Sequence, residues 1–110
     1  MFDFEKLNLY QRIRVVAVEI YKFSVVNQNI DSVLKDQLKR SSSSVMLNLA
    51  EGTGRVSAAD KKRFFVIARA SVFETVCIIQ MLYDLKVLEE FKYKSWYSKY
   101  EEISKMLLAC

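Results

Sequence analysis

The sequence predicts an all-α fold, an antiparallel up-down-up-down four-helix bundle in which residues 1–110 form a single domain. Three observations predict it. Apolar residues recur every three or four positions through four stretches, the spacing that gives a helix one apolar face. The segments between these stretches are short, which favours antiparallel neighbours. A chain of 110 residues can bury one sizeable core but not two.

The first helix is expected over residues 5–26, followed by a polar break at 27–29. Its apolar face is spaced 3, 4, 3 and consists of Ile13, Val16, Ile20 and Phe23. Asp31 is expected to cap the second helix, which should run to about residue 50 or 51. Gly52 would then supply the C-terminal cap.

The second helix carries two adjacent stripes of different chemistry. At about 100° per residue, one face collects apolar and small side chains: Leu34, Leu38, Ser41, Val45, Leu49 and Gly52. A narrow polar stripe lies beside it and consists of Gln37, Arg40, Ser44, Asn48 and Glu51. A helix that only covered a core would not need this second stripe.

The only two glycines, Gly52 and Gly54, lie in the segment 52–56. A glycine-rich loop can cradle a phosphate, but this one follows a helix rather than a strand and lacks the Gly-Lys-Ser/Thr ending of a P-loop. A tight turn between antiparallel helices is therefore the better interpretation.

Ser57 and Asp60 resemble a capping box that opens the third helix, which is expected to continue to about Leu85. From Phe64 onward this helix is apolar nearly all round. Such a helix must either be central in its fold or face another subunit. A bundle this small has no central helix, so we expect a contact between subunits. Cys77 is interpreted as a small core residue.

Glu74 is the one acidic residue on the face of the third helix that also holds Ile67, Ala70, Ile78 and Met81. A buried carboxylate is costly unless it is paired or hydrogen-bonded, and either Arg40 or Asn48 is a natural partner. We therefore expect a structural polar network between the second and third helices, made of Gln37, Arg40, Ser44, Asn48, Glu51 and Glu74.

Residues 91–94 are expected to connect to a fourth helix over about 95–108. Its inner face consists of Trp96, Tyr100, Ile103, Met106 and Leu107. Tyr93, Trp96 and Tyr97 have lysine neighbours and could stack on nucleobases, but core packing is the better interpretation.

The composition argues against an enzyme. The chain has no histidine, the commonest metal ligand and general base. Its two cysteines, Cys77 and Cys110, form no metal-ligand cluster, and no credible nucleophile–base pair is visible. We expect no catalytic residue, no metal site and no cofactor.

The chain is expected to be cytoplasmic and free of membrane contact. Its acidic N-terminus has no signal-peptide pattern, and no apolar run approaches the ~20 residues of a membrane span. Apolar residues nevertheless make up 52%, an excess that suggests burial by self-association.

The net charge of +4 is concentrated in residues 35–63, where seven basic residues face three acidic ones. A basic surface attracts phosphates and usually contacts the nucleic-acid backbone rather than reading base sequence. The candidate phosphate-binding residues are Lys35, Lys39, Arg55, Lys61, Lys62 and Arg63.

Residues 37–55 read Gln-Leu-Lys-Arg-Ser-Ser-x-Ser-Val-x-x-Asn-Leu-Ala-Glu-Gly-x-Gly-Arg. This segment resembles the signature of the bacterial four-helix-bundle proteins encoded in 23S ribosomal RNA intervening sequences, often labelled ribosomal proteins. Ser71 and Glu74, after Phe64-Phe65-x-Ile67-Ala68, resemble the third helix of that family. The resemblance covers essentially the whole chain; it departs at 27–29, where the family often has a proline.

The resemblance implies a homopentameric ring of bundles. It also implies kinship with the accessory variability determinant of diversity-generating retroelements, a basic pentamer thought to bind nucleic acid and to work with a reverse transcriptase. It implies no catalytic residues. The matching motif residues are as readily architectural as functional: Gln37, Arg40, Ser41, Ser44, Asn48, Glu51, Gly52, Gly54, Arg55 and Glu74.

Two functions are compatible with the sequence. The first is a non-enzymatic, oligomeric protein that contacts the phosphates of structured RNA, such as ribosomal RNA, or of DNA through its basic surface. The alternative is a protein-interaction scaffold whose homo-oligomer docks a protein partner without binding nucleic acid. Binding that weakens steeply with salt would favour the first.

Overall fold

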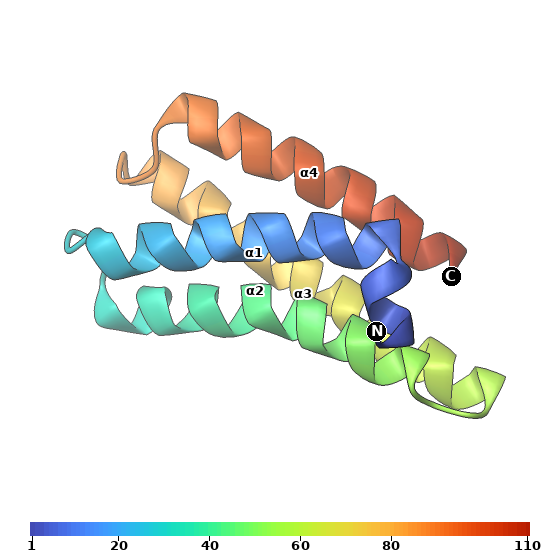
Figure 1. Cartoon of the computed structure of the whole chain (residues 1–110). Coiled ribbons are helices and arrows are strands. Elements are labelled where there is room, and N and C mark those ends of the chain that lie inside the picture. The colour runs from blue at the N-terminus through green and yellow to red at the C-terminus, as the bar shows by residue number, and fades with distance from the viewer.

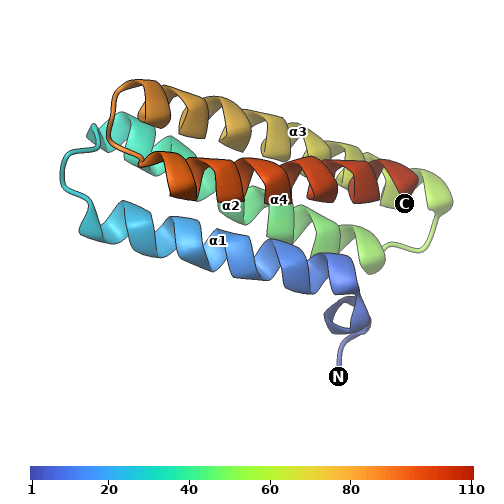
Figure 2. The same ribbon diagram turned by 90° about the horizontal axis from the view of Figure 1, so that it is seen from above.

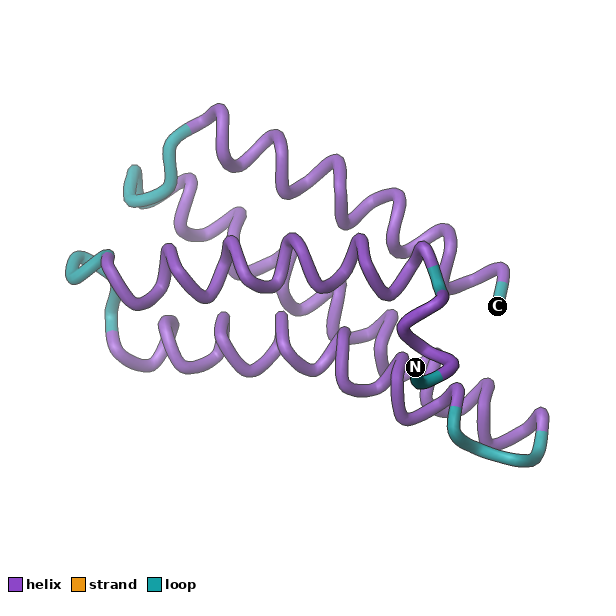
Figure 3. Tube along the Cα trace, viewed as in Figure 1, coloured by secondary structure: helices purple, strands orange, loops and turns teal.

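The computed structural model describes all residues from Met1 to Cys110 and contains helices but no strands. A short 3-10 turn, η1 (Asp3–Lys6), precedes α1 (Asn8–Val26), α2 (Ser32–Thr53), α3 (Ala58–Asp84) and α4 (Glu90–Ala109). Successive helices run in opposite directions, as the colour sequence in Figure 1 and the trace in Figure 3 show. The all-α four-helix fold expected from the sequence is confirmed.

Each helix packs against its two neighbours around the bundle. α1 and α3 both pack against α2 and α4, but the backbones of α1 and α3 do not approach each other closely. They therefore lie at diagonally opposite corners, with α2 and α4 between them (Figure 2). The contact between α2 and α3 is the most extensive in the molecule.

The helix starts follow local capping chemistry. The Asp31 carboxylate accepts the backbone N–H groups of Val33 and Leu34 at 3.1 and 3.3 Å, so it caps α2 as expected. The Ser57 hydroxyl accepts the N–H of Asp60 at 3.1 Å at the start of α3. The first helix begins later than expected because residues 3–6 form the separate turn η1.

Gly52 does not cap α2. The helix continues to Thr53, its cap is Gly54, and Gly52 is buried inside the last turn. A Cβ on Gly52 would lie 2.6 Å from Phe65 Cε1 and 3.1 Å from Phe64 Cβ. No real side chain tolerates the first of these distances, so this glycine serves the close approach of α3.

The connection to α4 is also shifted from the expected position. It spans residues 85–89, and residues 91–94 already lie in the first turns of α4. Lys86 turns the chain with a φ of 62°, which a glycine would adopt more easily. The N–H groups of Val87 and Leu88 then donate to the Leu82 carbonyl at 3.0 and 3.1 Å, which holds the turn against the end of α3.

The core contains the expected faces of the helices. The side chains of Leu38, Val45 and Leu49 on α2 are buried, as are the largest core residues, Trp96 and Tyr100 on α4. The Phe23 ring meets the Trp96 ring edge-on at 5.4 Å, so Trp96 is a core residue rather than a base-stacking one.

The outer face of α3 is unusually apolar and uncovered in the single chain. Cys77, expected in the core, is exposed there. By length and composition alone α3 could cross a membrane, although polar residues interrupt its apolar ones. Only 39% of its most apolar 18-residue window is buried within the single chain. A core helix of a soluble protein can have the same composition.

Candidate nucleic-acid interface

Four basic residues gather where α2 turns into α3: Arg55, Lys61, Lys62 and Arg63, here called the basic corner. The guanidinium groups of Arg55 and Arg63 both lie over the Phe64 ring, at 4.6 and 4.8 Å from its centre. This cation–π contact restrains two long side chains on one aromatic platform. Phe64 was not singled out from the sequence as a site residue.

The cations of the basic corner are only partly neutralised. The Arg55 guanidinium donates to the Glu51 carboxylate at 2.7 Å, while Arg63 and Asp60 are 3.9 Å apart. Lys61 and Lys62 have no ion-pair partner. The corner with its two carboxylates therefore carries a formal charge of +2, and the positive end of the α3 dipole adds to it.

Lys35 and Lys39 lie far from this corner. They are in the first half of α2, and twenty residues of sequence separate Lys35 from Arg55, about 30 Å along a helix. The Lys39 ammonium instead sits 5.5 Å from the centre of the Tyr21 ring on α1. The single basic surface expected from residues 35–63 is thus divided between the two ends of α2.

The polar stripe of α2 contributes to a network of hydroxyl groups facing α3. The Ser44 and Ser71 hydroxyls are 2.8 Å apart, and the Asn48 amide donates to the Ser44 hydroxyl and carbonyl, both at 2.9 Å. The buried Thr75 hydroxyl lies 2.9 Å from the Ser41 hydroxyl. Small side chains that satisfy one another's hydrogen-bonding groups let the two helices approach closely.

This network differs from the expected one in its members. Ser44 and Asn48 belong to it, but Gln37 makes no side-chain hydrogen bond and Glu51 pairs with Arg55. Thr75 was missed, and Ser41 was placed in the packing seam, because a serine or threonine within an apolar face is indistinguishable by spacing from a packing residue.

Glu74 is not buried in the single chain, contrary to the expectation. Its side chain is half-exposed, and its carboxylate lies 3.9 Å from the Arg40 guanidinium, at the outer limit of an ion pair. Arg40 is the partner in place of Asn48, but both charges are solvated, so the pair contributes little to stability. The expectation failed because α3 points this face outward.

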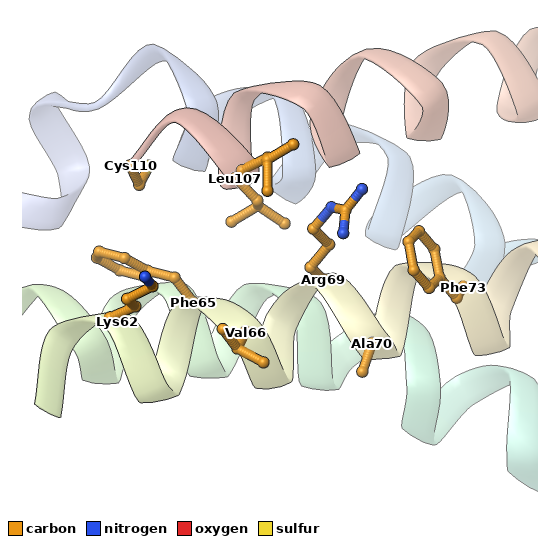
Figure 4. A pocket seen from close by; sticks show the side chains of 9 residues that line it. Lys62, Phe65, Val66, Arg69, Ala70, Phe73, Leu107 and Cys110 are labelled. Atoms are coloured by element: carbon orange, nitrogen blue, oxygen red, sulfur yellow. The ribbon is translucent and has the colours of Figure 1, made fainter. Parts of the chain in front are cut away.

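A shallow apolar groove of about 200 Å³ runs between α3 and the end of α4. Phe65, Val66 and Phe73 line it, and Arg69 crosses it to donate to the Ser104 carbonyl at 3.3 Å (Figure 4). Partial burial raises the pKa of the Cys110 thiol at its rim, which disfavours the reactive thiolate. No group of three His, Cys, Asp or Glu residues in the chain could hold a metal ion.

The fold and motif agree with known proteins. The family described as 23S rRNA-intervening sequence protein matches residues 5–109. A crystal structure of a protein of unknown function from the S23 ribosomal protein family of Bacteroides thetaiotaomicron VPI-5482 is 28% identical, with a TM-score of 0.84 over 92% of this chain and 95% of that chain. No curated protein sequence is significantly similar to this chain. The family match spans nearly the whole sequence, and the chain therefore belongs to the 23S rRNA-intervening sequence protein family.

Proposed function

We propose that this protein is a non-enzymatic, oligomeric nucleic-acid-binding protein that contacts the phosphates of structured RNA, such as ribosomal RNA, or of DNA. The observation that carries the proposal is the basic corner. Two lysines without ion-pair partners lie next to two arginines that share the Phe64 ring. Cations held in this way release counterions from a phosphate backbone without recognising particular bases.

The proposed assembly is the homopentamer that the sequence resemblance implies. Its support in the structure is the outer face of α3, which exposes large apolar side chains to solvent: Val66, Ile67, Phe73 and Met81. A subunit contact would remove this apolar area from water. Five copies would also multiply the modest charge of each basic corner into an extended phosphate-attracting surface. The proposed function requires no cofactor, metal or membrane, and it is compatible with a cytoplasmic protein.

Replacing Lys61, Lys62 and Arg63 together with Glu tests the proposal. Affinity for a structured RNA and for duplex DNA should fall by about 100-fold or more at low salt, because three cations per chain become anions. A fluorescence-anisotropy titration measures this, and circular dichroism checks that the variant is folded.

The matched control replaces Lys86, Lys92 and Lys94 with Glu. It changes the charge of the chain by the same amount but at the opposite end of the bundle. It should retain most of the binding. Equal losses in the two variants would show that overall charge, and not the basic corner, determines affinity.

The alternative function is a scaffold whose homo-oligomer docks a protein partner. It is favoured by the partial neutralisation of Arg55 and Arg63, which leaves the basic corner with only two excess charges. An oligomer that binds neither RNA nor DNA even at low salt would support this alternative and overturn the first proposal.

A further inference from the structure

α1 presents an exposed stripe on the side away from the core. Residues at spacings of 4, 3 and 4 lie along it and define the α1 stripe: Arg14, Val18, Tyr21 and Val25. Its apolar side chains are about as exposed as those of α3; Val18 is 47% and Tyr21 54% exposed. This 4-3 spacing is the one that keeps side chains facing a partner helix.

α3 presents a second such stripe, directly opposite its own core face. The α3 stripe, spaced 4, 3, 4 and 4, consists of Val66, Ala70, Phe73, Cys77 and Met81. Glu74 lies at its edge, and Asp84 extends it towards the end of the helix. Apolar stripes of this kind on a bundle surface mark protein contacts.

The two stripes face away from each other. α1 and α3 occupy diagonally opposite corners of the bundle (Figure 2). One two-fold axis therefore cannot cover both stripes with a single contact, whereas a head-to-tail contact between copies covers both. The α1 stripe is turned towards α2, where Lys39 meets Tyr21, so the two stripes are not fully opposed. A bend of this kind allows a head-to-tail chain of copies to close into a ring.

Lys62 and Arg69 lie beside the N-terminal half of the α3 stripe, but the charges beside its C-terminal half are complementary to those beside the α1 stripe. Arg14 and Lys22 on α1 have no ion-pair partner within the chain; on α3, Asp84 has none and Glu74 has only the distant Arg40. Arg14 and Tyr21 are seven residues apart, as are Glu74 and Met81. In a parallel pairing, the register that sets Arg14 beside Glu74 therefore also sets Tyr21 beside Met81, and it brings Lys22 within about one turn of Asp84.

We propose that the α1 stripe of one copy packs in parallel against the α3 stripe of a second copy, with Arg14 beside Glu74. This inference rests on the proposed oligomer and specifies the surfaces that build it. In a ring whose axis lies along the bundles, all copies point in the same direction. Because α1 and α3 run in the same direction within one chain (Figure 1), α1 of one copy is then parallel to α3 of the next. Two α3 stripes paired about a two-fold axis near Glu74 would instead bring like charges together.

The test uses two variants of the full chain, Val18→Glu on the α1 stripe and Phe73→Glu on the α3 stripe. Each should be a monomer at concentrations where the wild type is assembled, as measured by light scattering and native mass spectrometry. When mixed, they should form a 1:1 heterodimer, because each retains the surface that the other lacks. Phe91→Glu, at an exposed position on α4 outside both stripes, is the control and should assemble like the wild type.

A second measurement tests the charged pair. Arg14→Glu and Glu74→Lys should each weaken assembly, and the double variant should restore it. The combination of Arg40→Glu with Glu74→Lys exchanges the pair within one chain and should not restore it. Rescue by the Arg40 variant and not by the Arg14 variant would overturn the proposed register.

Other outcomes are equally decisive. A Val18→Glu variant that still dimerises by itself, or a mixture that stays monomeric with both variants folded, would overturn the head-to-tail contact. If the wild type is oligomeric and binds RNA in the same samples, the proposed function survives that failure. A monomeric wild type would overturn both this interface and the oligomer in the proposed function.

Discussion

Tyr100 combines complete burial with an unsatisfied hydroxyl group. Its side chain lies within the core on α4, and its hydroxyl oxygen has no hydrogen-bond partner. Burial raises the pKa of the phenol well above its usual value of 10.0, and the negative charge of Glu19 raises it further. The side chain therefore acts as a buried neutral ring that carries one costly polar atom.

Tyr100→Phe is expected to maintain or raise the free energy of unfolding, by up to about 1 kcal/mol at neutral pH, because it removes the unsatisfied group. The raised pKa means that the folded state holds the phenolic proton more tightly than the unfolded state. The stability that this tighter proton binding contributes to the folded state is fully present below pH 10 and is lost as the pH rises above it. The variant should lack this alkaline loss. Urea unfolding at neutral and alkaline pH measures both effects.

Tyr97→Phe is the matched control, since Tyr97 is partly exposed on the same helix and its substitution should change neither quantity. A loss of more than 1 kcal/mol in Tyr100→Phe would show that the hydroxyl group makes a stabilising hydrogen bond.

At the scale of the elements, close packing stabilises the contact between α2 and α3. The hydroxyls of Ser44 and Ser71 satisfy each other across the contact, and Gly52 leaves room for the Phe65 ring at the end of α2. The segment that carries the family motif therefore contains residues that this contact needs. This is a physical reason for the motif that is independent of any ligand.

Gly52→Ala tests this interpretation. The added Cβ would meet the Phe65 ring at 2.6 Å, so the ring must move, and overpacking of this kind costs about 1–3 kcal/mol. The better helix propensity of alanine offsets about 1 kcal/mol of that cost. A net loss of unfolding free energy is expected, measured by urea denaturation.

Gly54→Ala is the matched control two residues away. Its Cβ would meet only the Glu51 carbonyl oxygen at 3.5 Å, and its φ of −86° suits any residue. It should be neutral or stabilise the protein by about 0.4–1 kcal/mol. Equal effects of the two substitutions would mean that the Phe65 ring yields without cost.

At the scale of the whole molecule, assembly should be visible in the salt dependence of binding. One basic corner offers four cations, so one chain alone should give a slope of log affinity against log salt no steeper than about −3.6 on duplex DNA. If several corners of a ring contact the same nucleic acid, the slope should be steeper than this. Titrations between low and physiological salt measure it.

The monomeric variants of the two stripes provide the control for this measurement. They carry the intact basic corner but no ring, so their slopes should fall to the single-corner value or below it. A wild-type slope no steeper than that of the monomers would show that each chain binds independently.

Features that depend on neighbouring residues could be predicted from the amino-acid sequence. Helix periodicity, the caps at Asp31 and Ser57, and the buried face of α4 all follow from contacts within a few residues or from one repeating angle. The family motif lies within a single helix and its following turn, so it too was readable without a structure.

Features that depend on the distance between helices could be seen only once the helices were packed together. A helix advances about 1.5 Å per residue, so Lys35 in the first turn of α2 lies far from Lys62, which is on α3 beyond the other end of α2, although both belong to the same basic segment of the sequence. The role of Gly52 depends on Phe65, which belongs to the next helix, and the exposure of Glu74 depends on which way α3 faces. Local sequence specifies which side chains share a face; the packing of one helix on another determines what that face meets.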